Sequence, residues 1–84
     1  MRFLLTDLAN GKATLPPGRY NVRMMHDPPL NRQVTSVAWE RHRGGRWLFV
    51  RWIPEPRDDG GRDCGYSGYS EDHDRLAEFA LTPA

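Results

Sequence analysis

The clearest pattern in the chain is the alternation of apolar and polar side chains over residues 34–53. The runs Val34–Arg43 and Arg46–Ile53 alternate on either side of the dipeptide Gly44-Gly45. Successive side chains of a strand point to opposite faces of a sheet, and a two-residue glycine turn is typical of a hairpin. The pattern therefore predicts a β-hairpin over 34–53, with the second strand stopped by Pro54.

Weaker alternation precedes this hairpin. Met1–Leu8 and Lys12–Leu15 flank Asn10-Gly11, a dipeptide that favours the positive backbone angles of a type I′ turn, so a β-hairpin is expected over 1–15. Arg19–Met25 alternates again and predicts a third segment of sheet, a strand over 19–25. Together these segments predict about five antiparallel strands.

The last third of the chain has a different pattern. Residues 58–70 are rich in glycine, aspartate and tyrosine, which predicts an irregular acidic loop. Ser70 is a good helix N-cap, and Leu76, Phe79 and Ala80 recur at helical spacing, so a helix is expected over 71–81. The fold class expected is mainly β (α+β): a small antiparallel sheet and one C-terminal helix in a single domain over 1–84.

Composition bounds the setting of the protein. The chain has 84 residues, one cysteine and no apolar run of the length that spans a bilayer. No secretory signal is recognisable, and a small fold with a single cysteine has no internal disulfide, so we expect a cytoplasmic protein without a membrane partner.

Charge divides the chain into a basic part and an acidic part. Residues 1–57 contain ten basic and four acidic residues, whereas residues 58–84 contain two basic and seven acidic residues. A dedicated nucleic-acid footprint usually gives a domain a much higher pI than the value of 8.0 found here. We therefore interpret the split as two parts that neutralise each other on folding.

The 34–53 hairpin offers the best candidate site. With Gly44-Gly45 as the turn, Arg43 lies opposite Arg46, and Trp39 lies opposite Val50. One face is then apolar and fits a core: it carries Val37, Trp39, Leu48, Val50 and Trp52. The other face mixes aromatic and charged side chains: it carries Ala38, Glu40, His42, Trp47, Phe49 and Arg51. The candidate binding residues, including the arginines near the turn, are Trp47, Phe49, Arg51, His42, Arg43, Arg46 and Glu40.

Binding of a protein partner is the first hypothesis for this surface, because tryptophan and arginine dominate the energetics of protein interfaces. Small chains of this kind often act by blocking or scaffolding a larger assembly. A phage or mobile-element inhibitor of a host nucleoprotein complex, such as an anti-CRISPR protein, fits the size. A homodimer through the same face is a related form of this hypothesis.

Two alternatives remain. Aromatic side chains interleaved with arginine are also typical of single-stranded nucleic-acid binding. A metal-independent ribonuclease is the third hypothesis, with Glu40 as base, His42 as acid and Arg51 on the phosphate. Cys64 and His73 lack the ligand pairs of a zinc site, so we expect no metal and no cofactor. Non-catalytic binding is the interpretation we favour.

Overall fold

Two antiparallel sheets make up most of the protein. The computed structural model describes residues 1–23, 28–69 and 79–84, and for His42 and residues 66–69 it describes the backbone alone. The elements are β1 (Phe3–Leu4), α1 (Leu5–Ala9), β2 (Tyr20–Val22), β3 (Leu30–Arg32), β4 (Val34–His42), β5 (Gly45–Pro56), β6 (Arg62–Tyr69) and β7 (Ala80–Pro83). One sheet has the strand order β1-β7-β2-β3 and the other β4-β5-β6. The prediction of a mainly β fold is confirmed, although the strands fall into two sheets rather than one.

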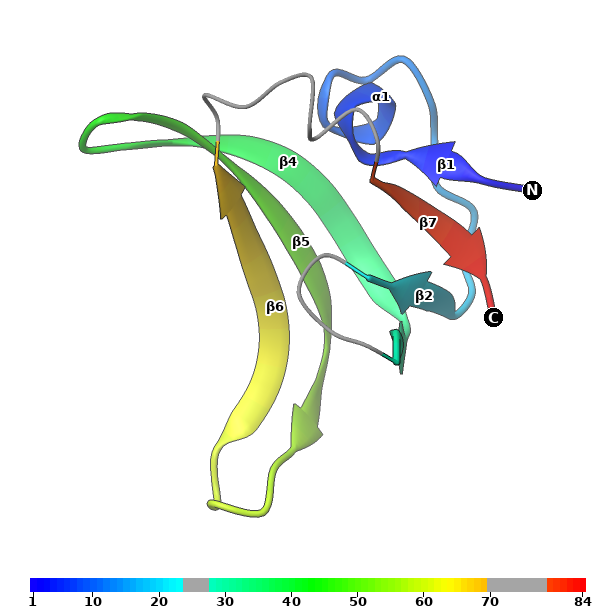
Figure 1. The fold of residues 1–84 in the computed structure, drawn as a ribbon, viewed down its shortest axis with the longest axis vertical. Helices are drawn as coiled ribbons and strands as arrows, with labels where there is room; N and C mark the ends of the chain where they lie inside the picture. The colour runs from blue at the N-terminus through cyan, green and yellow to red at the C-terminus, as the bar shows by residue number, and fades with distance from the viewer. Residues whose placement is uncertain (24–27, 70–78) are drawn as a thin grey trace.

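The chain passes from one sheet to the other at Gln33. This residue alone separates β3 from β4, and its carbonyl accepts a hydrogen bond of 3.0 Å from the backbone N–H of Ile53. The long strands β4, β5 and β6 form one curved layer, while α1, β1, β7 and β2 lie together beside it (Figure 1). Each layer can therefore bury one face against the other.

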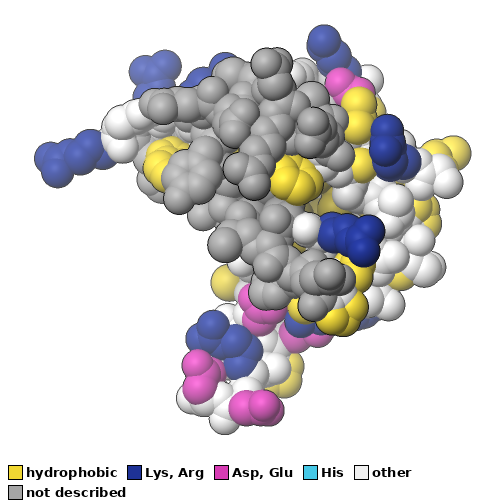
Figure 2. Space-filling model, viewed as in Figure 1, with side chains coloured by type: hydrophobic (Ala, Val, Ile, Leu, Met, Phe, Trp, Pro, Cys, Tyr) yellow, Lys and Arg dark blue, Asp and Glu magenta, His cyan; other side chains and the backbone are white. Residues whose placement is uncertain are grey.

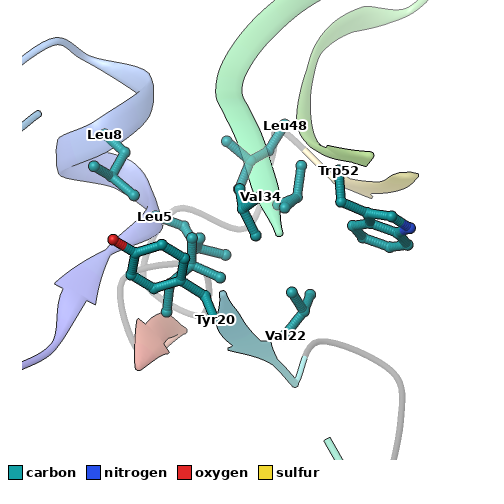
Figure 3. Close-up of a cluster of buried hydrophobic side chains, with 9 residues drawn as sticks. Leu5, Leu8, Tyr20, Val22, Val34, Leu48 and Trp52 are labelled. Carbon is teal, nitrogen blue, oxygen red and sulfur yellow. The ribbon is translucent and has the colours of Figure 1, made fainter. Parts of the chain in front are cut away.

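The core lies between these two layers (Figure 3). The β4–β5 hairpin and the opposite layer both supply buried side chains: Leu5, Leu8, Tyr20, Val22, Val34, Leu48, Val50, Trp52 and Leu81. Val37 and Trp39 are partly buried and pack against this cluster. The prediction of an apolar core face on the hairpin is therefore confirmed.

The register of the hairpin differs from the prediction by two residues. His42 pairs with Gly45 and Trp39 with Leu48, so the chain turns at 43–44 rather than at 44–45. Because side chains alternate with a period of two, an even slip leaves every side chain on its expected face. The expected stop at Pro54 is also wrong, since β5 continues to Pro56.

The predicted hairpin over 1–15 is wrong. The chain forms α1 directly after the short strand β1, and Leu5 and Leu8, three positions apart, are both buried. Gly11 has φ of 75°, and its N–H donates to the carbonyl of Leu8 (3.3 Å), so Asn10-Gly11 ends a helix instead of joining two strands. Helices long and apolar enough to cross a membrane are absent from the described part of the chain.

Residues 58–70 and 71–81 also depart from prediction. Most of the expected loop is strand β6, because Arg57 and Gly61 close a tight turn and the chain then pairs with β5. Residues 71–78 of the expected helix lie outside the described residues, but Ala80 and Leu81 belong to β7, which pairs with β1 and β2. Leu81 is fully buried there, so sheet pairing and core packing override helical spacing at these positions.

The prediction of a strand over 19–25 is confirmed for Tyr20–Val22, which forms β2. Arg23 follows the strand, and residues 24–25 lie outside the described residues. The partner strand β3 was not predicted. Pro28-Pro29 directly precede this three-residue strand and favour a turn or loop in the sequence. The strand forms through pairing with β2 rather than through an alternating pattern of its own.

An ion-pair network joins the two sheets where β3 lies near β5 and β6. Arg32 of β3 contacts Glu55 of β5 (3.0 Å) and Asp63 of β6 (3.4 Å), and Arg19 also contacts Glu55 (3.1 Å). At the far tip of the β5–β6 hairpin, acidic and basic side chains again lie together, with Arg57 3.3 Å from Asp59 (Figure 2). The Arg32–Asp63 pair is a contact between the basic and acidic parts of the chain.

Candidate binding groove

The outer face of the β4–β5–β6 sheet carries most of the predicted binding residues. Glu40 pairs with Trp47 across the two strands, and Ala38 pairs with Phe49. Trp47, Phe49 and Glu40 are partly buried on this face. These three side chains lie together on the outer face, as the sequence pattern predicts.

Two of the predicted residues, Arg43 and Arg46, lie away from this face. Arg43 is exposed at the turn, and the side chain of His42 lies outside the described part of the structure. Arg46 projects from the opposite face, where its guanidinium carbon lies 4.6 Å from the centroid of the Trp39 ring. Arg46 is thus separated from Phe49 and Arg51 by the thickness of the sheet.

Arg51 crosses the ring of Phe49 to reach Glu40. In the strand register, the row that contains Phe49 lies between the rows of Arg51 and Glu40. The guanidinium carbon of Arg51 lies 5.2 Å from the centroid of the Phe49 ring, and its Nη2 forms an ion pair with the Glu40 carboxylate. The side chains of Arg51 and Glu40 are 43% and 36% exposed, so the pair adds only about 0–1 kcal/mol to stability. Its main effect is to hold the arginine over the aromatic ring.

The same contact bears on the ribonuclease hypothesis. Of its three residues, the structure brings together Glu40 and Arg51, and it joins them directly. The hypothesis needs the Glu40 carboxylate to face a substrate hydroxyl and Arg51 to face a phosphate, whereas here the two side chains contact each other. The hypothesis gains no support from this geometry.

A groove of about 530 Å³ opens beside Phe49 and Arg51. Residues from all three strands line it: Thr35, Phe49, Val50, Arg51, Trp52, Pro54, Cys64 and Gly65. Among these lining residues Arg51 alone carries a charge. A mostly apolar hollow with one fixed polar anchor is the usual composition of a binding site.

Two irregularities of the sheet create this groove. On one side of β5 the register with β4 shifts between Val34 and Ser36, and on the other side the register with β6 shifts between Arg51 and Glu55. Ile53 donates its N–H toward Gln33, so the next residue along the strand, Pro54, is the one that would donate toward β6 and has no N–H to do so. The pairing is interrupted there, and bulges of this kind bend a strand and re-aim its side chains.

Cys64 and Gly65 were missed as site residues because β6 was predicted as a loop. Cys64 is an exposed free thiol on the groove. Gly65 lies so close to β5 that a Cβ atom there would be 2.9 Å from the carbonyl oxygen of Val50. Glycine is therefore required for this close approach. A glycine inside a strand often marks such an approach, but this signal applies only if residues 62–69 are predicted to be a strand. No three His, Cys, Asp or Glu residues in the described ranges are grouped to hold a metal ion.

Comparison with protein-family models found no match, and searches of curated proteins and of solved structures found none either. The case for a function therefore depends on the chemistry and geometry of the groove.

Proposed function

We propose that this chain is a non-catalytic binding protein that holds a segment of a protein partner in the groove on its outer face. The observation that carries the proposal is the groove itself: an apolar hollow across three strands, with Phe49 on its wall and Arg51 fixed beside it. Aromatic and arginine side chains at the edge of an apolar pocket are typical of interface hot spots. The inhibitor of a larger complex considered from the sequence is one form of this proposal.

The charges near the groove favour a protein partner over nucleic acid. A protein binds a phosphate backbone through several Lys or Arg side chains, which neutralise the phosphates and release their counterions. Arg51 is the one cation among the described groove residues, and it is paired with Glu40. Arg19, Arg32 and Arg57 also have carboxylate partners. An apolar side chain with a neighbouring polar or acidic group fits such a groove better than a polyanion does.

A peptide selection tests the proposal without a known partner. Display libraries of random linear peptides are selected against the folded protein, and the affinity of enriched peptides is measured by fluorescence anisotropy. We expect peptides with an apolar anchor, whose affinity falls at least about tenfold with Phe49→Ala, or about 1.4 kcal/mol.

Ile53→Ala is the matched control. Ile53 is a large apolar residue on the same strand, 44% exposed and outside the groove lining, so its truncation is expected to leave binding unchanged. Equal loss in both variants, or no enriched peptide, would contradict the proposal. Tight binding of a single-stranded oligonucleotide that falls steeply with salt would instead support the nucleic-acid alternative.

A further inference from the structure

A second hollow lies on the outer side of the other sheet. It has a volume of about 350 Å³ and is lined by Arg2, Asn21, Arg23, Pro29, Ala80 and Thr82. Its polar groups differ from those of the groove: two guanidinium groups, one amide and one hydroxyl, all of which can donate hydrogen bonds. We infer that this hollow, which we call the arginine pocket, binds the phosphate group of a small ligand.

Strand order explains why these residues meet. β7 lies between β1 and β2, and Thr82 of β7 pairs with Asn21 of β2. Leu81 pairs with Phe3, so Arg2, the residue before β1, is in register with Thr82 on the other side of β7. The same register places Arg23 beside Ala80. The two arginines therefore flank β7 diagonally, about 12 Å apart at their backbones by standard strand spacings.

Alternation directs these side chains away from the core. Tyr20, Val22 and Leu81 are buried; the pocket residue Asn21 lies between the first two in sequence, and the pocket residue Thr82 directly follows Leu81. Arg23, one position beyond Val22, is exposed. The pocket is thus a solvent-facing hollow on the back of a packed sheet, so a ligand can enter without disturbing the core.

The charge of the pocket is not neutralised within the described residues. Arg19, Asn21 and Arg23 alternate on one side of β2, but Arg19 is paired with Glu55, whereas no carboxylate in the described part of the chain contacts Arg23 or Arg2. Two guanidinium groups that line one hollow attract a dianion more strongly than a monoanion. Guanidinium forks match the oxygens of a phosphate, and Asn21 and Thr82 can add neutral donors.

Titration followed by amide ¹H–¹⁵N NMR tests this inference. The probes are inorganic phosphate, adenosine monophosphate and adenosine, each at constant ionic strength. We expect saturable shifts at Asn21, Arg23, Ala80 and Thr82 with both phosphate-bearing probes and none with adenosine. Tighter binding of adenosine monophosphate would identify a phosphate ester as the ligand, and equal binding would identify free phosphate.

Variants separate the pocket from general charge attraction. Arg23→Gln and Arg2→Gln are each expected to weaken phosphate binding at least tenfold. Arg43→Gln removes the same charge from the exposed β4–β5 turn, and binding should be unchanged. Equal weakening in all three variants, shifts at every exposed arginine, or wild-type affinity in Arg23→Gln would overturn the inference. Because the pocket and the groove lie on different sheets, this result is independent of peptide binding.

Discussion

Leu48→Ala is expected to lower the free energy of unfolding by about 2–5 kcal/mol, the range found when a buried leucine is truncated in a packed core. Leu48 is fully buried on the central strand β5, where it belongs to the cluster shared by both layers. The stability of small domains is about 5–15 kcal/mol, and a chain of this length lies near the lower end. The variant should therefore be partly unfolded at 25 °C.

Urea denaturation followed by tryptophan fluorescence measures this loss. If Leu48→Ala does not fold, Leu48→Met keeps most of the side-chain volume and is expected to cost less than about 1.5 kcal/mol. Ile53→Ala, an exposed position on the same strand, should change stability by less than about 0.5 kcal/mol. A Leu48→Ala loss no larger than that of Ile53→Ala would show that the two layers do not share this core.

Gly65→Ala is expected to destabilise the protein by about 1–3 kcal/mol, the usual cost of forcing an extra methyl group into a tightly packed site. The added Cβ would lie 2.9 Å from the carbonyl oxygen of Val50, a backbone atom that cannot move without displacing β6 from β5. Since Gly65 also lines the groove, the variant should weaken peptide binding as well.

Gly61→Ala provides the matched comparison. A Cβ at Gly61 meets the guanidinium of Arg57, which lies at the end of a flexible, exposed side chain. The side chain can rotate away, so the variant should be neutral or slightly stabilised by the lower entropy of its unfolded state. Similar unfolding free energies for the two variants would contradict the close approach of β6 to β5.

The part of the fold that the sequence predicts well is the hairpin whose two faces differ in polarity. Leu48 and Trp52 are buried and Phe49 and Arg51 lie on the outer face, as alternation indicated. The predicted turn was displaced, but the displacement was an even number of residues. Face assignment depends on the parity of the register alone, so the sequence predicts the candidate cluster on the correct face despite the error in the turn.

The parts that the sequence predicts poorly depend on context. Asn10-Gly11 fits both a hairpin turn and a helix C-terminus, and only the burial of Leu5 and Leu8 selects the helix. The glycine-rich segment Arg62–Tyr69 has little strand pattern of its own, yet pairing with β5 makes it a strand. The stabilisation of such a segment in a sheet comes mostly from its cross-strand neighbours. The sequence of the segment itself does not show which neighbours it will have.

The groove itself could not be predicted from the sequence. It arises where β5 loses regular pairing on both sides, near Trp52 on one edge and at Pro54 on the other. The sequence pattern predicts the end of a strand at Pro54, whereas the strand continues past it and the missing donor shifts the register instead. The same proline therefore explains both the error in strand length and the position of the candidate site.

The most direct test of groove binding uses Cys64, the single cysteine of the chain, which is exposed on the groove wall. The rate of alkylation of its thiol by iodoacetamide is measured with and without a saturating amount of a selected peptide. A peptide seated in the groove would cover the thiol, so we expect a severalfold slower reaction, with clearly less slowing in Phe49→Ala at the same peptide concentration. An unchanged alkylation rate for a bound peptide would place the binding site elsewhere and contradict binding in the groove.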